Sequence, residues 1–170
     1  MNILSKWYPQ IKVNYKKDLD LTVKFRKLVP DAVTPQYAQD GDAGLDLTAT
    51  SFRIDSTFIE YGTGIAVEIP NGHVGLLFPR SSITKAPAGV SLKNSVGVID
   101  SNYRGEILVR FDLPYSDRVK GVLPDVGKKV AQLIILPYPT VYFQEVQELS
   151  DSNRGDGGFG STDKNWFGYL

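Results

Sequence analysis

The sequence predicts an all-β domain, a sandwich or a barrel, with at most one short helix. Short alternations of apolar and polar residues recur along the chain, and turn residues separate them: the 170 residues include 16 glycines and 10 prolines. A period of two is typical of strands that bury one face. Helical periodicity is nearly absent, and the best candidate is a single turn in residues 81–86, which Pro87 limits.

The predicted strands follow one another at short intervals. Leu21, Val23 and Phe25 alternate with polar residues in the first, and a polar turn lies between the two strands of the segment GVIDSNYRGEILVRFDL. The predicted strands are residues 21–26, 45–48, 65–69, 73–78, 97–100, 106–113, 130–136 and 140–146. We predict an N-terminal extension at 1–20, a β domain at 21–150 and a glycine-rich mobile arm at 151–170.

Composition excludes several classes of function. Lys+Arg and Asp+Glu are both 19, so no net field draws the chain to nucleic acid or to an anionic membrane. There is no cysteine and a single histidine, His73, which argues against thiol nucleophiles, zinc sites and serine–histidine triads. No segment is apolar enough for a signal peptide or a membrane span. We therefore expect a soluble, cytoplasmic protein without a membrane or nucleic-acid partner.

Two islands of polar residues come early in the chain. In GDAGLDLTA, Asp42 and Asp46 are four apart, so in a strand they would share a face. They are either turn and solvated residues or carboxylates that face a metal-bound phosphate. In FPRSSIT, Arg80, Ser81 and Ser82 follow an apolar run, which suits either anion binding or an ordinary serine cap.

A third island is GVSLKNSVGVIDSNYRGE. The side chain of Asn94 and the free backbone groups of its hairpin could pair with a flat heterocycle, and Tyr103 could lie against a sugar. Asp100 comes before the polar turn, directly after Val98 and Ile99. It either caps the turn or occupies a half-buried site for chemistry.

Two further islands lie near the C-terminus. Gln132 is the one polar side chain in the apolar run VAQLIIL, and its partners are either backbone groups or the oxygens of a ligand. In RGDGGFGSTD, Arg154, Ser161 and Thr162 could bind phosphate while Phe159 folds over a base, although the segment alone reads as a disordered terminus. Jointly, the five islands suit a nucleoside polyphosphate and an activated water.

In order and spacing, these islands closely resemble the five motifs of the trimeric dUTPase family. The resemblance runs from about Leu21 to Thr162 and rests on DAGLDL, PRSS, GVIDSNYRGE, GKKVAQL and RGDGGFGST. It implies a jelly-roll or distorted β-barrel subunit, of the β-clip type, in a homotrimer whose subunits share active sites. It also implies hydrolysis of dUTP to dUMP and pyrophosphate with Mg²⁺, which keeps uracil out of DNA and supplies dUMP.

The resemblance also implies a role for each island. Asp100 is the general base that activates water, Tyr103 packs under the deoxyribose, and Asn94 and its hairpin read uracil. Asp46 contacts the magnesium through water. The residues expected to bind substrate are Arg80, Ser81, Ser82, Asn94, Val98, Tyr103, Gln132, Arg154, Phe159, Ser161 and Thr162.

One residue departs from the family pattern, and two other functions are open. The second motif commonly reads PRSG, and Ser82 stands in place of its glycine. Serine keeps the backbone N–H, so we expect function to be retained. The alternatives are a dCTP deaminase of the same fold, which needs a catalytic glutamate, and a nucleotide-sensing regulator, in which a motif residue would be lost.

Overall fold

The computed structural model describes residues 21–85, 90–113 and 125–157. The chain divides into two compact units, residues 1–139 and 140–170. The described strands and the short 3-10 helix η2 all lie in the first unit, so the all-β prediction is confirmed. The predicted domain boundary at residue 150 stays a prediction. Among the described residues, no helix has the length and apolar character needed to cross a bilayer.

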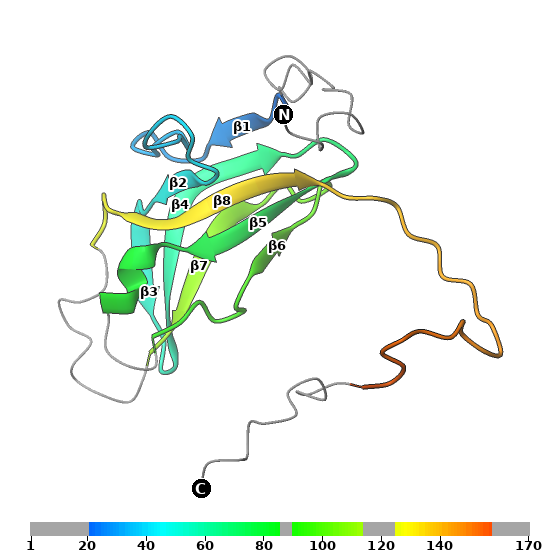
Figure 1. Cartoon of the computed structure of the whole chain (residues 1–170). Helices are drawn as coiled ribbons and strands as arrows, with labels where there is room; N and C mark the ends of the chain where they lie inside the picture. The colour runs from blue at the N-terminus through cyan, green and yellow to red at the C-terminus, as the bar shows by residue number, and fades with distance from the viewer. Residues whose placement is uncertain (1–20, 86–89, 114–124, 158–170) are drawn as a thin grey trace, which may run out of the picture. The chain divides into compact units, whose positions relative to one another are not determined.

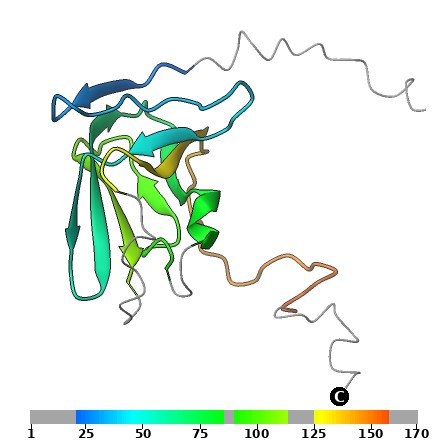
Figure 2. The same cartoon turned by 90° about the vertical axis from the view of Figure 1, so that its left-hand side faces the viewer.

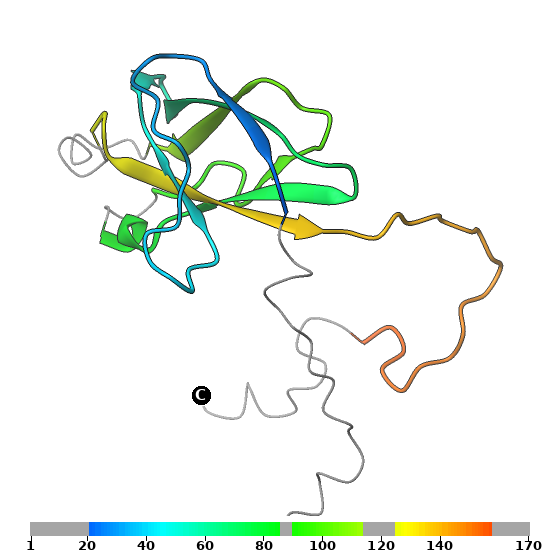
Figure 3. The same cartoon turned by 90° about the horizontal axis from the view of Figure 1, so that it is seen from above.

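Two four-stranded antiparallel sheets form the first unit (Figure 1). One has the order β1-β4-β3, with β7 also paired to β4, and the other has the order β2-β8-β5-β6. The long strand β8 runs through the second sheet, as Figure 3 shows from above. The strands are β1 (Lys24–Lys27), β2 (Leu45–Thr48), β3 (Ser51–Ile54), β4 (Phe58–Glu68), β5 (His73–Pro79), β6 (Gly97–Ile99), β7 (Glu106–Asp112) and β8 (Lys129–Pro137).

Side chains from both sheets build one hydrophobic core. The predicted alternation in β7 is confirmed, because Ile107, Val109 and Phe111 are buried while the residues between them are exposed. The rings of Tyr61 and Phe111 meet edge to face with centroids 6.2 Å apart. The largest fully buried side chains are Tyr61, Phe111, Leu47, Ile65, Ile69, Ile107, Leu133, Val109 and Thr63.

A β-bulge in β4 lies opposite the start of β7. Because β6 pairs with β5 in one sheet and β7 pairs with β4 in the other, the turn between β6 and β7 joins the two sheets and is not a hairpin. The register with β7 shifts between Gly62 and Ala66, and Gly64 adopts a φ of 65°. The amide of Gly64 donates to the Glu106 carboxylate at 2.7 Å. A Cβ on Gly64 would lie 2.6 Å from a methyl group of Val29, so both conformation and space require glycine here.

The predicted strands differ from the structure in four places. Pairing of the first predicted strand begins at Lys24 rather than at Leu21, and residues 140–146 form no strand. β4 begins at Phe58 rather than at residue 65, and β3 was not predicted. In the second unit Tyr142 and Phe143 are 89% and 99% exposed. Alternation describes the two faces of a strand, but a strand also needs a free edge to pair with. Sequence periodicity carries no information about that edge.

The predicted helical turn is confirmed as η2 (Ser81–Lys85), which follows β5 (Figure 2). The amide of Ile83 donates to the carbonyl of Arg80 at 3.0 Å, and the hydroxyl of Thr84 donates to the carbonyl of Ser81 at 2.7 Å. Asp42 lies in a turn before β2, where its carboxylate accepts from the amide of Gln39 at 2.9 Å. The idea that Asp42 shares a strand face with Asp46 is therefore wrong.

A buried carboxylate ties three strands of the first sheet together. Glu60 of β4 is 7% exposed and pairs with Arg53 of β3 at 2.6 Å and with Arg110 of β7 at 2.5 Å. The hydrogen bond from Arg53 is the largest cause that holds the pKa of Glu60 below its ordinary value. Burial acts in the opposite direction, and Arg110 adds to the lowering.

We expect Glu60→Gln to lower the free energy of unfolding by about 1–3 kcal/mol at pH 7. Because folding lowers the pKa of Glu60, its stabilisation is complete above the ordinary glutamate value of about 4.3. This stabilisation is lost as the pH falls through the lower pKa that Glu60 has in the folded state. Urea unfolding at pH 7, 5 and 3.5 measures this change. Glu68→Gln is the matched control, since its pair with Lys24 is exposed. If the difference in the free energy of unfolding between wild type and Glu60→Gln does not narrow at pH 3.5, the role assigned to Glu60 is wrong.

Candidate active site

The turn between β6 and β7 carries two of the predicted site residues. Asp100 follows β6 directly, and its carbonyl accepts from the amide of Tyr103 at 3.1 Å. The hydroxyl of Tyr103 donates to the carbonyl of Glu106 at 2.9 Å. The tyrosine ring lies so close over Gly105 that a Cβ there would clash with it. Glycine at 105 therefore lets the ring lie against the backbone.

A hollow of about 200 Å³ opens beside this turn. The predicted residues Asn94, Val98, Asp100 and Tyr103 all line it, so the structure brings this group together. Asp100 is exposed rather than half-buried, which corrects the sequence-based expectation for the isolated chain. The reason is that Val98 beside it is itself 63% exposed, since β6 forms the edge of its sheet.

The loop that carries Asn94 is held by a strained residue. Ser95 has a φ of 60° and is the one non-glycine residue with a positive φ in the described ranges. Its amide donates to the carbonyl of Leu92 at 2.9 Å, and the amide of Val96 donates to the carbonyl of Asn94 at 2.6 Å. Such strain is often stored where a loop must present groups to a ligand.

A second group of predicted residues lies at the junction of β2, β5 and β8. Asp46 of β2 is 8% exposed, and its Oδ1 atom lies 3.1 Å from Nε of Arg80, directly after β5. Its Oδ2 atom lies 2.6 Å from Nζ of Lys129 in β8. Among the described residues Oδ2 makes no aligned hydrogen bond, so the contact with Lys129 is an ion pair without directional support.

Gln132 is half-buried in the same group. Its Nε2 donates to the carbonyl of Pro79 at 3.1 Å, so a backbone partner occupies one of its two amide hydrogens. Its Oε1 lies 2.5 Å from the position that a Cβ on Gly44 would take. Glycine at 44 therefore leaves space for the Gln132 amide, which bonds to the end of β5.

Ser81 and Ser82 are exposed in η2, beside Arg80. Ser82 has an ordinary helical backbone with negative φ, because Ser95 is the described non-glycine residue that departs from it. The glycine common at this position in the family is therefore not needed for the backbone conformation seen here. The expectation that function is retained with Ser82 stays a prediction.

Only part of the predicted glycine-rich island can be located. Arg154 belongs to the second unit, where its Nε donates to the carbonyl of Gly157 at 2.7 Å. Gly155 has a φ of 56°, and its amide donates to the hydroxyl of Ser152 at 3.0 Å. Phe159, Ser161 and Thr162 lie outside the described residues.

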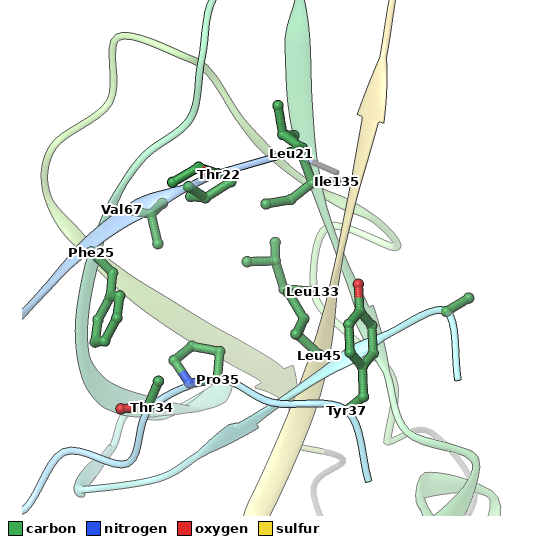
Figure 4. A pocket seen from close by; sticks show the side chains of 12 residues that line it. Leu21, Thr22, Phe25, Thr34, Pro35, Tyr37, Leu45, Val67, Leu133 and Ile135 are labelled. Atoms are coloured by element: carbon green, nitrogen blue, oxygen red, sulfur yellow. The ribbon is translucent and has the colours of Figure 1, made fainter. Parts of the chain in front are cut away.

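A larger hollow lies elsewhere in the first unit. This apolar groove of about 570 Å³ is lined by side chains such as Leu21, Phe25, Tyr37, Leu133 and Ile135 (Figure 4). None of the predicted site residues lines it. We place the candidate site at the smaller hollow and the Asp46 junction instead, because those two regions hold the carboxylates, cations and amides that chemistry requires.

Sequence reasoning missed Lys129. Strict alternation along β8 places Lys129 and Gln132 on opposite faces, because they are three residues apart. The register with β2 shifts between Leu47 and Thr48, so one extra residue of β8 lies between the pairs on either side. That shift turns Lys129 toward Asp46. The doubled lysine in GKKVAQL was a signal of positive charge, but it did not indicate which lysine faces inward.

Known proteins resemble this chain along most of its length. A family model described as dUTPase matches residues 31–163. The deoxyuridine 5'-triphosphate nucleotidohydrolase of Corynebacterium glutamicum is 42% identical over 144 residues, which cover 84% of this chain and 95% of that protein. The protein of the same name from Clostridium kluyveri is 41% identical over 150 residues, covering 85% and 98%.

Solved structures show the same fold. The dUTPase of Staphylococcus bacteriophage 80alpha, in complex with dUpNHpp, has a TM-score of 0.69 and 26% identity, covering 82% of this chain and 97% of that one. A variant of the phage phi11 dUTPase, described with a structural Mg(II) ion, has a TM-score of 0.61 and 26% identity, covering 75% and 98%. On the extent of these matches, the chain belongs to the dUTPase family.

Proposed function

We propose that this chain hydrolyses dUTP to dUMP and pyrophosphate. The hollow at the β6–β7 turn carries the proposal, because it gathers an amide, a tyrosine and a carboxylate in a chain of the dUTPase family. A dCTP deaminase is less well supported, since the Asp100 and Tyr103 pattern is that of the dUTPase motif. A regulator that only senses the nucleotide is less well supported because no motif residue is lost.

In this proposal Asp100 accepts a proton from the attacking water. The water oxygen forms a bond to the α-phosphorus, and the bond from that phosphorus to the bridging oxygen breaks, so pyrophosphate leaves. A positioned base of this kind contributes roughly 10²–10⁴ in rate. Asp100 is exposed in the single chain. Bound substrate and a neighbouring subunit would exclude the surrounding water.

Asn94 and Val98 would contact uracil in the hollow, and Tyr103 would pack under the deoxyribose. The hydrogen bond from its hydroxyl to the Glu106 carbonyl supports this role, because it holds the ring flat against Gly105. A ring fixed in this way leaves little room for a 2′-hydroxyl. The phosphate chain would lie near the junction of β2, β5 and β8, where it would be held by Arg80, Ser81, Ser82 and Gln132.

Magnesium is the divalent ion that we propose for the reaction, since it neutralises charge on a phosphate chain. The described residues do not fit a metal held by protein alone: they contain no cluster of three carboxylate or imidazole ligands, and both oxygens of Asp46 face cations. The ion would therefore arrive with the triphosphate. The assignment of Asp46 as its contact through water stays a prediction.

The arm and the assembly complete the proposed site. Arg154, Phe159, Ser161 and Thr162 would close over the nucleotide, with Phe159 against the base. We propose a homotrimer in which the group at Arg80 and Gln132, the turn that carries Asp100, and the arm that carries Arg154 come from different subunits. The exposed apolar side chains at residues 141–149 support this, because a neighbouring subunit could cover them. The cytoplasm, with its nucleotide pool, is the proposed location.

The first of three predictions from this proposal concerns the substrate and the general base. Wild type with magnesium should release pyrophosphate from dUTP and strongly prefer it to dTTP, dCTP and UTP.

Asp100→Asn should keep the fold and the binding of dUpNHpp while losing about two or more orders of magnitude in kcat, since an amide cannot accept the proton. Comparable turnover of UTP would overturn the role of Tyr103, and a near-normal kcat in the variant would overturn that of Asp100.

The second concerns Gly44. A methyl group there would come within 2.5 Å of the Gln132 Oε1 atom and displace the amide from the Pro79 carbonyl. We expect Gly44→Ala to raise the KM for dUTP by about tenfold, as for the loss of one well-made polar contact. Steady-state kinetics measures the KM for dUTP, and a thermal melt of the same sample checks that the variant is folded. An unchanged KM in a folded variant would remove Gln132 from the phosphate site.

The third concerns the shared site. Two inactive variants, Asp100→Ala and a chain truncated after Ser150, are unfolded and reassembled together at equal amounts. If the turn that carries Asp100 and the arm come from different subunits, random mixing restores about a quarter of the sites, by probability on a threefold ring. Mass spectrometry checks that mixed trimers form, and dUTP turnover is the readout. Mixed trimers without activity would exclude shared sites and leave the proposed reaction standing.

A further inference from the structure

Backbone pairing between β4 and β7 is interrupted just where β7 begins. Gly62 pairs with Leu108 and Ala66 pairs with Glu106, so three residues of β4 lie opposite the single residue Ile107. Backbone groups at such an interruption need partners outside the regular ladder. The position of the first residues of β7 is therefore set by the contacts that replace the ladder.

Two side chains bridge the interruption. The hydroxyl of Thr63 donates to the carbonyl of Ile107 at 2.8 Å, and this bond is buried. The carboxylate of Glu106 accepts from the amide of Gly64 at 2.7 Å. Glu106 is the first residue of β7, so it is also the residue at which the turn after Asp100 ends. Its side chain thus fixes the end of that turn to the neighbouring strand.

The backbone of Glu106 makes a second contact, on the side of the hollow. Its carbonyl accepts from the hydroxyl of Tyr103 at 2.9 Å, and the amide of Tyr103 donates to the carbonyl of Asp100 at 3.1 Å. The tyrosine is therefore held both at its backbone and at its hydroxyl. Tyr103 and Glu106 both line the hollow of about 200 Å³. A shift of Glu106 would move the tyrosine ring relative to that hollow.

The carboxylate of Glu106 faces the protein. Its Oε1 atom accepts from the amide of Gly64 and lies 2.8 Å from the position that a Cβ on Gly62 would take. Two glycines of β4 therefore leave the space that this oxygen occupies, and the residue as a whole is half-buried. With its oxygen committed to β4, Glu106 affects a ligand in the hollow through Tyr103.

We propose that Glu106 is a positioning residue that sets the preference of the site for deoxyribose over ribose. The proposal rests on the proposed hydrolysis of dUTP. The carboxylate fixes the first residue of β7 to the bulge, the carbonyl of the same residue fixes the hydroxyl of Tyr103, and the ring then keeps a 2′-hydroxyl out. Without the carboxylate, the start of β7 and the ring gain freedom to move, and a ribose is accepted more readily.

Three substitutions separate the reach of the side chain from its charge. Glu106→Gln keeps an acceptor oxygen at the same distance along the side chain and loses the charge. Glu106→Asp keeps the charge but is one methylene shorter, so it falls short of the Gly64 amide. Glu106→Ala loses both. The matched control is Glu68→Ala, which removes an exposed carboxylate from β4 in the same sheet.

The measurement is the ratio of kcat/KM for dUTP to kcat/KM for UTP, with magnesium, in each variant. We expect Glu106→Ala to lower this ratio by about tenfold, as for a lost hydrogen bond to a charged group, and Glu106→Asp by about threefold or more. Glu106→Gln and Glu68→Ala should stay within about twofold of wild type. Equal losses for both nucleotides would show that Glu106 only supports the fold. Selectivity kept by Glu106→Asp and lost in Glu106→Gln would show that its charge acts on the substrate. Either result would overturn the proposal.

A double-mutant cycle tests whether Glu106 acts through Tyr103. Tyr103→Phe keeps the ring and removes the hydroxyl, so it should itself lower the ratio. The loss caused by Glu106→Asp should then shrink by about threefold or more in the Tyr103→Phe background, because no hydroxyl is left to position. Additive losses in folded variants would exclude this route.

The outcomes separate this inference from the proposed function. If wild type releases pyrophosphate from neither nucleotide, the proposed function fails. If wild type hydrolyses dUTP and UTP equally well, the hydrolysis stands and the inference fails. If wild type prefers dUTP and every Glu106 variant keeps that preference, only the role of Glu106 fails. Thermal melts check the fold of each variant, and if Glu106→Ala does not fold, the comparison of Glu106→Asp with Glu106→Gln decides.

Discussion

The bulge of β4 at Gly64 is the constraint on which the arrangement of the site depends. Its left-handed residue turns the amide of Gly64 toward the carboxylate of Glu106, and this bond fixes where β7 begins. The carbonyl of the same Glu106 accepts from the hydroxyl of Tyr103. The bulge, the start of β7 and the ring that lines the hollow are therefore linked by two hydrogen bonds through one residue. Close contacts with Val29 and Ala32 keep a side chain out of position 64 and so preserve the bulge.

The sequence predicts the fold class because alternation is a local property. The inward face of β7 follows directly from it, as the burial of Ile107, Val109 and Phe111 confirms. In β4 both faces are buried, so alternation does not describe that strand. Alternation fails to predict which segments pair with another strand. Residues 140–146 alternate as a strand does, yet within the described part of their unit, residues 140–157, they pair with no other strand. Whether an edge is free depends on chain segments far away in the sequence, so periodicity cannot settle it.

The candidate site shows the same division. Asn94, Asp100 and Tyr103 could be grouped from the sequence because they are close together in the chain, and the structure places them around one hollow. The exposure of Asp100 could not be predicted. It depends on what covers an edge strand rather than on the apolar residues next to Asp100 in the sequence. Lys129 could not be found either, since a single register shift reverses the face to which it points.

The charge balance of the chain explains how such a site can select its ligand. With 19 acidic and 19 basic residues, there is no long-range field to attract every polyanion, and nucleic acid gains nothing from a general approach. A carboxylate buried under two cations creates positive potential over a few ångströms only. In the proposed function, the triphosphate of dUTP would lie at such a region, and its base and sugar would lie in a hollow of about 200 Å³. Local charge and a small cavity together favour a mononucleotide over a polymer, although neither feature does so alone.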